Sequence, residues 1–165
     1  MDRLWSPWRL EYVSGTTTPK IGCVFCDATR PPEPDSLIVC EGSTSYVVLN
    51  LYPYNNGHLM VVPRRHVATL RGLTPEELQE VALLTQRSEA VLTEAYRPEG
   101  INVGVNLGKS AGAGIHEHLH VHLVPRWAGD TNFMTVVGET RVLPEDLLST
   151  AERLRPLFAA LSSSE

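Results

Sequence analysis

The sequence contains no long hydrophobic run. No apolar stretch approaches the roughly 18 residues that a membrane-spanning helix needs. The first residues, from Met1 to Trp8, also lack the apolar stretch of a secretory signal peptide. We therefore expect a soluble, cytoplasmic protein that has no membrane partner.

Positive charge is also scarce. The chain has 14 Lys and Arg against 19 Asp and Glu, so its formal net charge is -5 at pH 7. This balance excludes the overall basic surface of a non-specific nucleic-acid binder, although a local basic cluster could still hold a small anion. With 42% hydrophobic and 20% charged residues among 165, the composition is typical of one globular domain that needs no disulfide scaffold.

Cysteine is rare, and two of the three cysteines lie close together in the run Cys23-Val24-Phe25-Cys26. In a reducing compartment this spacing indicates a metal clip, with a redox pair or two inert thiols as alternatives. A redox pair usually begins a helix after a strand, whereas Gly22 and the proline-rich residues 30–34 place this pair in irregular chain. Cys40 stands in an apolar stretch and is expected to be a buried small hydrophobe.

Short runs of apolar, often β-branched residues predict the strands. These runs cover residues 37–40, 46–49, 59–62, 101–106 and 118–124. The first two runs are joined by a short turn and predict a hairpin. Pro63 and Pro125 are expected to stop the third and the last strand.

Two amphipathic segments predict helices. Thr74, Pro75 and Glu77 have the spacing of a capped helix start, and apolar residues then recur at helical spacing until Pro98. A second helix is expected to open at residues 144–146 and to end or kink at Pro156.

The order of these elements is β-β-β-α-β-β-α with short links. It predicts an α+β fold, in which one long helix and one C-terminal helix cover an antiparallel β-sheet. We expect an irregular N-terminal arm over residues 1–36 that packs on the domain, the domain itself over residues 37–160, and a frayed tail over residues 161–165.

Four histidines occupy alternate positions in the segment from His116 to His122. In a strand they project from one face, about 6.6 Å apart, while the apolar residues between them project from the other. The same segment spells H-E-x-x-H, the zinc protease signature, from His116 to His120. That motif works only on a helix, because on a strand its two histidines stand about 13 Å apart and cannot share a metal ion. The alternating apolar residues favour the strand.

At this point the residues resemble a known family. The run His118-Leu119-His120-Val121-His122-Leu123-Val124 fits the pattern of the histidine triad (HIT) superfamily of nucleotide hydrolases and transferases. The resemblance extends to the Cys23-x-x-Cys26 pair, to the segment from Gly57 to His66, to the loop from Asn106 to Gly114 and to Pro125-Arg126-Trp127. Residues 4–9 and 52–58 look like the bacterial branch described as diadenosine tetraphosphate hydrolases or phosphorylases.

The resemblance implies an enzyme that acts on phosphoanhydride bonds, with residues 37–160 as its catalytic domain. His120 would attack the α-phosphorus of a dinucleoside polyphosphate and form a covalent nucleotidyl-histidine. A backbone carbonyl would hold the other ring nitrogen of His120, and we expect that carbonyl in the loop at residues 109–114. His122 would donate to the scissile phosphate. Water is the favoured acceptor, with inorganic phosphate as the alternative. A nucleoside phosphoramidate or a mononucleotide is the alternative substrate. A nucleotide-binding regulator with vestigial chemistry is the alternative function.

The small-residue loop before the triad is expected to bind phosphate, because glycines let backbone N–H groups approach its oxygens. An ordinary turn is the alternative. The loop residues proposed to contact substrate are Asn106, Lys109, Ser110, Gly112 and Gly114. The family pattern also implies that Asn50 binds the ribose hydroxyls. Ile38, Val39 and Val48 could wall an adenine pocket or belong to the core, and Trp5 and Trp8 could stack on a base or anchor the arm.

The zinc-bearing members of the family imply a structural zinc site. Its ligands would be Cys23, Cys26, His66 and His118, which would tie the arm to the histidine segment. His116 is extra to this pattern and is expected to face solvent, whereas His58 is expected to pack beside the site. The resemblance also implies a homodimer and a nucleotide substrate.

Overall fold

The computed structural model describes residues 22–28, 36–130 and 145–162. In chain order its elements are α2 (Val24–Asp27), β1 (Ile38–Glu41), β2 (Ser45–Leu49), β3 (Leu59–Pro63), the 3₁₀ helix η1 (Leu70–Gly72), α3 (Pro75–Tyr96), β4 (Gly100–Val105), the 3₁₀ helix η2 (Lys109–Ala111), β5 (Val121–Arg126) and α5 (Leu147–Ser162). The strands form one sheet in the order β1-β2-β3-β5-β4, and every neighbouring pair is antiparallel. This arrangement confirms the predicted α+β fold.

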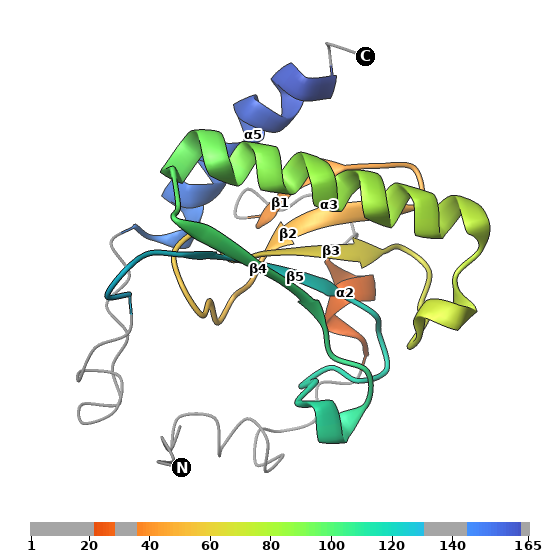
Figure 1. Cartoon of the computed structure of the whole chain (residues 1–165). Helices are drawn as coiled ribbons and strands as arrows, with labels where there is room; N and C mark the ends of the chain where they lie inside the picture. The colour runs from red at the N-terminus through yellow and green to blue at the C-terminus, as the bar shows by residue number, and fades with distance from the viewer. Residues whose placement is uncertain (1–21, 29–35, 131–144, 163–165) are drawn as a thin grey trace, which may run out of the picture.

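The sheet has two different faces (Figure 1). The helices α3 and α5 pack on one face, and the short helix α2 lies on the other. Side chains of β2 alternate between the faces: Val47 and Leu49 join the core under α3, whereas Tyr46 and Val48 pack with Phe25 of α2. All five residues of β2 are therefore buried.

The long helix α3 begins as the sequence predicts. The Thr74 hydroxyl accepts the Glu77 N–H at 3.2 Å, and the Glu77 carboxylate accepts the Thr74 N–H at 2.8 Å, which is the reciprocal capping box. The helix ends at Arg97, which adopts the left-handed conformation with φ 46° just before Pro98. None of the helices of the described residues is long and apolar enough to cross a membrane.

The last strand differs from the prediction at both ends. β5 begins at Val121, because the Leu119 N–H leaves the sheet pattern and donates to the Val67 carbonyl at 2.6 Å. Pro125 does not stop the strand, since the ladder to β4 continues until Arg126 pairs with Gly100. His118 and His120 therefore precede the strand, and only His122 lies within it.

The C-terminal helix also passes a proline. Pro156 lies inside α5 and does not end it, because buried Leu154 and Phe158 anchor the helix to the core on either side. The helix begins after Asp146, whose carboxylate accepts the Leu148 and Ser149 N–H groups at 3.0 Å each.

The predicted N-terminal arm and C-terminal tail need two corrections. Residues 24–27 of the arm form the helical turn α2, whose Phe25 is buried on the sheet, and α5 extends into the predicted tail as far as Ser162. Most of the arm lies outside the described residues, including Trp5 and Trp8.

Candidate active site and metal centre

The triad histidines gather on the sheet face that carries α2. His122 pairs with Met60 of β3, so its side chain shares the face of Met60 and Val48. The His120 and His122 ring centroids lie 4.7 Å apart with a 79° angle between the planes. Residues 114–120 form no helix, so the zinc protease arrangement is absent from this segment.

A backbone carbonyl holds the ring of His120. The His120 Nδ1 lies 2.8 Å from the His118 carbonyl oxygen, which can only accept, so Nδ1 carries the proton and Nε2 keeps its lone pair. This corrects our expectation that the carbonyl would come from residues 109–114. Burial lowers the pKa of His120, although the hydrogen bond to His118 opposes the shift, and the ring is therefore held neutral near pH 7.

A second histidine stands behind His122. His58 is fully buried, and its Nδ1 accepts the Tyr54 backbone N–H at 3.0 Å, so its Nε2 carries the proton. That Nε2 lies 3.0 Å from the His122 Nδ1 and donates to it. In the neutral ring of His122 the remaining proton is then on Nε2. The histidine that the sequence placed beside the site therefore selects the tautomer of the third triad histidine.

Tyr54 is a site residue that the sequence analysis missed. Its ring centroid lies 4.8 Å from that of His58 and 6.0 Å from that of His122, nearly parallel to the latter. The turn-rich composition of residues 52–57 predicted a loop but carried no signal that this loop would fold back onto the triad.

The proposed ribose ligand lies at the edge of this group. The Asn50 Oδ1 accepts the Tyr52 backbone N–H at 2.9 Å, and its Nδ2 lies 3.4 Å from the His58 Nδ1. Tyr52 itself is 71% exposed. The residues that could line an adenine pocket lie on different faces of the sheet. Val39 belongs to the core under the helices, whereas Val48 and Ile38 lie on the face that carries the triad.

The small-residue loop joins β4 to the histidines. Asn106 follows Val105, which pairs with Val121, so the loop leaves the sheet directly beside His120. Lys109 and Ser110 lie in η2 and are exposed, as is Gly114, whereas Gly112 is half-buried. Gly112 has φ 86°, a conformation that favours glycine.

The four predicted metal ligands come together in the structure. One ligand atom from each of Cys23, Cys26, His66 and His118 lies within 4.8 Å of all the others. The His118 Nδ1 lies 3.2 Å from the Cys23 Sγ and 3.6 Å from the Cys26 Sγ, and the His66 Nδ1 lies 3.4 Å from the Cys26 Sγ. Zinc bonds of 2.0–2.3 Å in a tetrahedron put neighbouring ligand atoms roughly 3.4–3.8 Å apart, so this set fits the ion.

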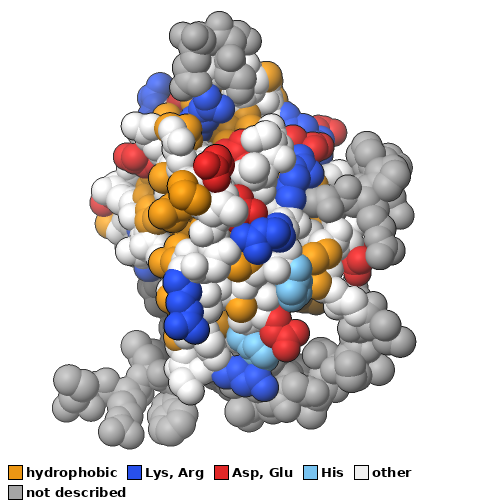
Figure 2. All heavy atoms as spheres, turned by 90° about the vertical axis from the view of Figure 1, so that its right-hand side faces the viewer, with side chains coloured by type: hydrophobic (Ala, Val, Ile, Leu, Met, Phe, Trp, Pro, Cys, Tyr) orange, Lys and Arg blue, Asp and Glu red, His pale blue; other side chains and the backbone are white. Residues whose placement is uncertain are grey.

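The ring of His118 is already oriented for a metal. Its Nε2 lies 2.8 Å from the Pro63 carbonyl oxygen, so Nε2 carries the proton and Nδ1 faces the thiols. Burial lowers the pKa of His118 and so favours the neutral ring that binds metal. Figure 2 shows histidine side chains reaching the surface among basic and acidic groups. His66 is exposed. His116 is half-buried and does not belong to the cluster of four metal ligands.

Comparison with known proteins finds similarity to HIT proteins over most of the chain. A model of the HIT domain matches residues 31–129. A Mycobacterium tuberculosis (strain H37Rv) protein called AP-4-A phosphorylase is 43% identical over 96% of this chain and 85% of its own length. A Dictyostelium discoideum bis(5'-adenosyl)-triphosphatase is 34% identical over 69% of this chain and 80% of its own.

A solved structure has the same fold. The crystal structure of a zinc-bound histidine triad family protein from Mycobacterium smegmatis superposes with a TM-score of 0.70, at 28% identity, over 88% of this chain and 99% of that one. With its histidine run, its sheet and these matches, the chain belongs to the HIT family.

Proposed function

We propose that this protein cleaves dinucleoside polyphosphates of the diadenosine tetraphosphate type through a covalent nucleotidyl-histidine. The observation that carries the proposal is the pair of fixed tautomers: His120 has a lone pair on Nε2, and His122 has a proton on Nε2, with the two rings in contact. One ring is thus prepared to attack and its neighbour to donate.

The first step follows from these tautomers. The His120 Nε2 attacks the α-phosphorus, a nitrogen–phosphorus bond forms, and the bond to the bridging oxygen breaks. The His122 Nε2–H donates a hydrogen bond to the bridging oxygen, so the polyphosphate leaves as a stabilised anion and His122 keeps its proton. An acceptor oxygen then attacks the adduct, the nitrogen–phosphorus bond breaks, and the electron pair returns to His120; if the acceptor is water, its proton passes to solvent.

The names of the relatives support the substrate class and bear on the acceptor. The relative that covers 96% of this chain is called a phosphorylase, and the one that covers 69% is called a triphosphatase. The sequence alone slightly favoured water, but the longer match favours inorganic phosphate. Both acceptors use the same first step.

Product analysis tests this function. The protein is incubated with diadenosine tetraphosphate, with and without inorganic phosphate, and the nucleotides are separated. We expect ATP and ADP if phosphate is the acceptor, and ATP and AMP if water is. Cleavage of a nucleoside phosphoramidate but not of the tetraphosphate would assign the alternative substrate, and no cleavage of either would contradict the proposed function.

We propose that the substrate lies between the triad and the loop at residues 106–114. Asn50 would bind the ribose hydroxyls, and Asn106, Lys109, Ser110, Gly112 and Gly114 would bind the phosphates. The route of this loop, which leaves β4 beside His120, supports the assignment. The chain as a whole is acidic, and the exposed ammonium of Lys109 would supply positive charge for the phosphates at this loop.

We also propose that Cys23, Cys26, His66 and His118 hold a structural zinc ion. Four protein ligands complete a tetrahedron, so a zinc ion bound here would stabilise the fold and leave the chemistry to His120. Burial, and then the neighbouring Cys23, raise the pKa of the Cys26 thiol when no cation is present, so binding must displace its proton.

A homodimer and a cytoplasmic location complete the proposal. β4 forms an edge of the sheet with Asn102, Val103 and Gly104 exposed, and such an edge can pair with a second copy. The Cys23-x-x-Cys26 pair lies in the metal cluster, and the use of cysteine as a metal ligand is typical of proteins in a reducing compartment.

A further inference from the structure

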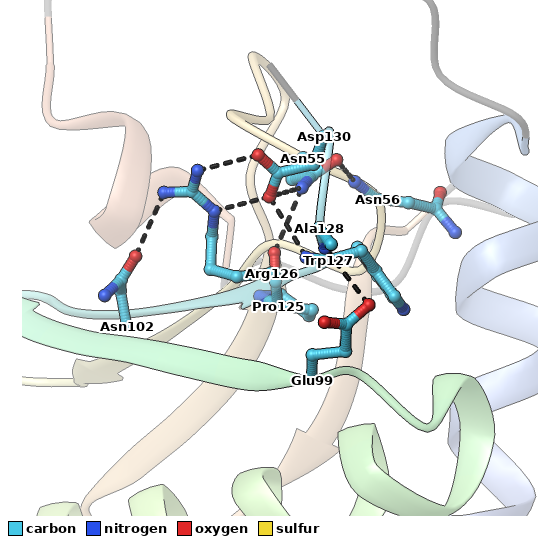
Figure 3. A network of polar contacts seen from close by, with 9 residues as sticks. All are labelled: Asn55, Asn56, Glu99, Asn102, Pro125, Arg126, Trp127, Ala128 and Asp130. Carbon is cyan, nitrogen blue, oxygen red and sulfur yellow. Dashed lines mark hydrogen bonds and ion pairs between the residues drawn. The ribbon is translucent and has the colours of Figure 1, made fainter.

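A polar network ties the loop before β3 to the end of β5 (Figure 3). The Asn55 side-chain amide donates to the Pro125 carbonyl at 3.1 Å and to the Asp130 Oδ2 at 3.0 Å. Pro125 stands three residues after His122 on the same strand. Asn55 therefore attaches its loop to the strand that carries the third triad histidine.

Asp130 is itself held firmly. Arg126 donates to both of its carboxylate oxygens, at 2.6 and 2.7 Å, and the Trp127 N–H donates to Oδ2 at 3.2 Å. The Asp130 side chain is only 9% exposed, whereas its partner Arg126 is 45% exposed, and the two are joined by charge-assisted hydrogen bonds. A short Asp side chain bound in this way is a rigid acceptor for Asn55.

Asn55 also accepts hydrogen bonds from residues of its own loop. Its carbonyl accepts the His58 N–H at 3.3 Å, and its Oδ1 accepts the Asn56 N–H at 3.1 Å. Gly57 closes the turn with φ 72°, where a Cβ would lie 2.9 Å from the Tyr96 ring. Asn55 thus lies between Tyr54, whose N–H donates to His58, and His58 itself.

We propose that Asn55, anchored by Asp130 and Arg126, is a positioning residue for His122. It sets the distance between the loop that carries Tyr54 and His58 and the strand that carries His122. That distance maintains two hydrogen bonds: one from the Tyr54 N–H to the His58 Nδ1, and one from the His58 Nε2 to the His122 Nδ1. The inference rests on the proposed function, in which His122 must present a proton on Nε2.

A purely structural role predicts different results. Arg126 is 45% exposed, and an exposed ion pair contributes little to stability, so the network has no large stabilising role of its own. If it only closed a loop, its loss would lower stability and leave the histidine tautomers alone. If it positions His58, the tautomers must change even in the absence of substrate.

The test compares Asn55→Ala with the control Asn102→Ala. Asn102 accepts from Arg126 at 3.1 Å in the same network, but it belongs to β4 and not to the loop that carries Tyr54 and His58. Long-range ¹H–¹⁵N NMR of the substrate-free protein reports which imidazole nitrogen carries the proton. We expect one tautomer for His58 and His122 in the wild type and in Asn102→Ala, and a mixture in Asn55→Ala.

The kinetic arm uses diadenosine tetraphosphate. We expect kcat to fall roughly 10- to 100-fold in Asn55→Ala, with KM within about twofold, because misplaced groups cost rate more than binding. Asp130→Asn keeps the shape but weakens the acceptor; it should show a smaller loss in the same direction and serves if Asn55→Ala does not fold. Unchanged tautomers in Asn55→Ala, or in Asp130→Asn if that variant serves, would overturn the inference, whether or not the wild type cleaves this substrate.

Discussion

His120 depends on two features of its surroundings: one comes from a neighbour in the chain and the other from α2, which is distant in the sequence. The His118 carbonyl fixes the proton on Nδ1, and burial beside Phe25, whose ring centroid lies 5.0 Å away, keeps the ring neutral. A neutral imidazole with an available lone pair needs no further base to attack phosphorus. His120 as a whole residue is 6% exposed.

Replacing the nucleophile gives the first prediction. His120→Asn should lower the rate of tetraphosphate cleavage by about 10³-fold or more, because the covalent step is lost. Product chromatography and mass spectrometry of the quenched wild-type adduct measure the effect. His116→Asn is the matched control, since His116 is half-buried outside the metal cluster and the His58–His122 pair, and should keep its activity. Cleavage at the wild-type rate by His120→Asn would exclude the covalent mechanism.

The residues that sequence patterns identified are those whose role follows from their own chemistry. The spacing of Cys23 and Cys26 indicated a metal clip, the resemblance to zinc-bearing HIT proteins implied His66 and His118 as the other two ligands, and the four come together in the structure. Tyr54 was missed because it acts through a backbone N–H, which every residue but proline has. The carbonyl behind His120 was misplaced for the same reason.

At the scale of elements, α3 shows local sequence and tertiary contacts acting together. Glu77 caps its own helix and also pairs with Arg65, whose Nη2 lies 2.6 Å from the carboxylate. The hydrogen bonds from Arg65 and then from the Thr74 N–H lower the pKa of Glu77 to about 2. The helix start is therefore coupled to the segment that follows β3.

This coupling predicts a pH-dependent stability. A carboxylate whose pKa is lowered by folding stabilises the fold fully at pH values above its ordinary pKa near 4.5. This contribution is lost as the pH falls toward the lowered pKa of about 2. Glu77→Gln should thus cost about 1 kcal/mol at pH 7, the usual size of a helix cap, while the half-exposed Arg65 adds little. The difference from wild type should shrink steadily between pH 4.5 and 2.

Urea unfolding at pH 7 and at pH 2.5 measures this difference. Glu89→Gln, an exposed position on the same helix, is the control and should change stability little at either pH. Equal destabilisation by Glu77→Gln at both pH values would show that the carboxylate charge is not responsible.

Strand and helix ends show where element prediction fails. The capping box made the start of α3 readable, and Pro98 marked its end. β5 starts three residues late and passes Pro125, and α5 passes Pro156, because partners far away in the sequence determine those ends. A proline prevents one hydrogen bond, but it does not end an element that neighbouring residues hold in place.

At the scale of the whole molecule, the metal cluster links three separate segments. Cys23 is the N-cap of α2 and Cys26 lies within that helix, His66 follows β3, and His118 precedes β5. An ion in this cluster would hold α2 against the sheet and fix the residue whose carbonyl orients His120. Stability and activity should therefore both respond to the metal.

Removing one ligand gives the third prediction. Cys26→Ser should reduce bound zinc from about one ion per chain to near zero and lower Tm by at least about 3 °C, the shift expected for about 1 kcal/mol in a chain of this size. Elemental analysis and thermal unfolding measure the two effects. Cys40→Ala, which changes a half-buried thiol outside the cluster, should keep its zinc. A wild-type protein that contains no zinc and gains no Tm when zinc is added would refute the site.

The exposed edge at β4 gives a prediction about assembly. Val103 is 52% exposed in this strand, and a charge on a sheet edge opposes pairing with another edge. Val103→Lys should shift the proposed dimer toward monomer in sedimentation velocity. Leu83→Lys, at a 43% exposed position on α3, is the control and should remain dimeric. A dimer that is unaffected by Val103→Lys would place the interface elsewhere.

The sequence by itself determined the fold class, the five strands and the two long helices, and the chemistry available, because periodicity, capping residues and histidine spacing are local properties. Only the tertiary structure decided two of the contacts: the His58–His122 pair and the Asn55 bridge to β5. Those contacts depend on the order of the strands in the sheet and on backbone groups of residues far apart in the chain. No pattern of side-chain types records them, because a backbone N–H or carbonyl is the same in almost every residue.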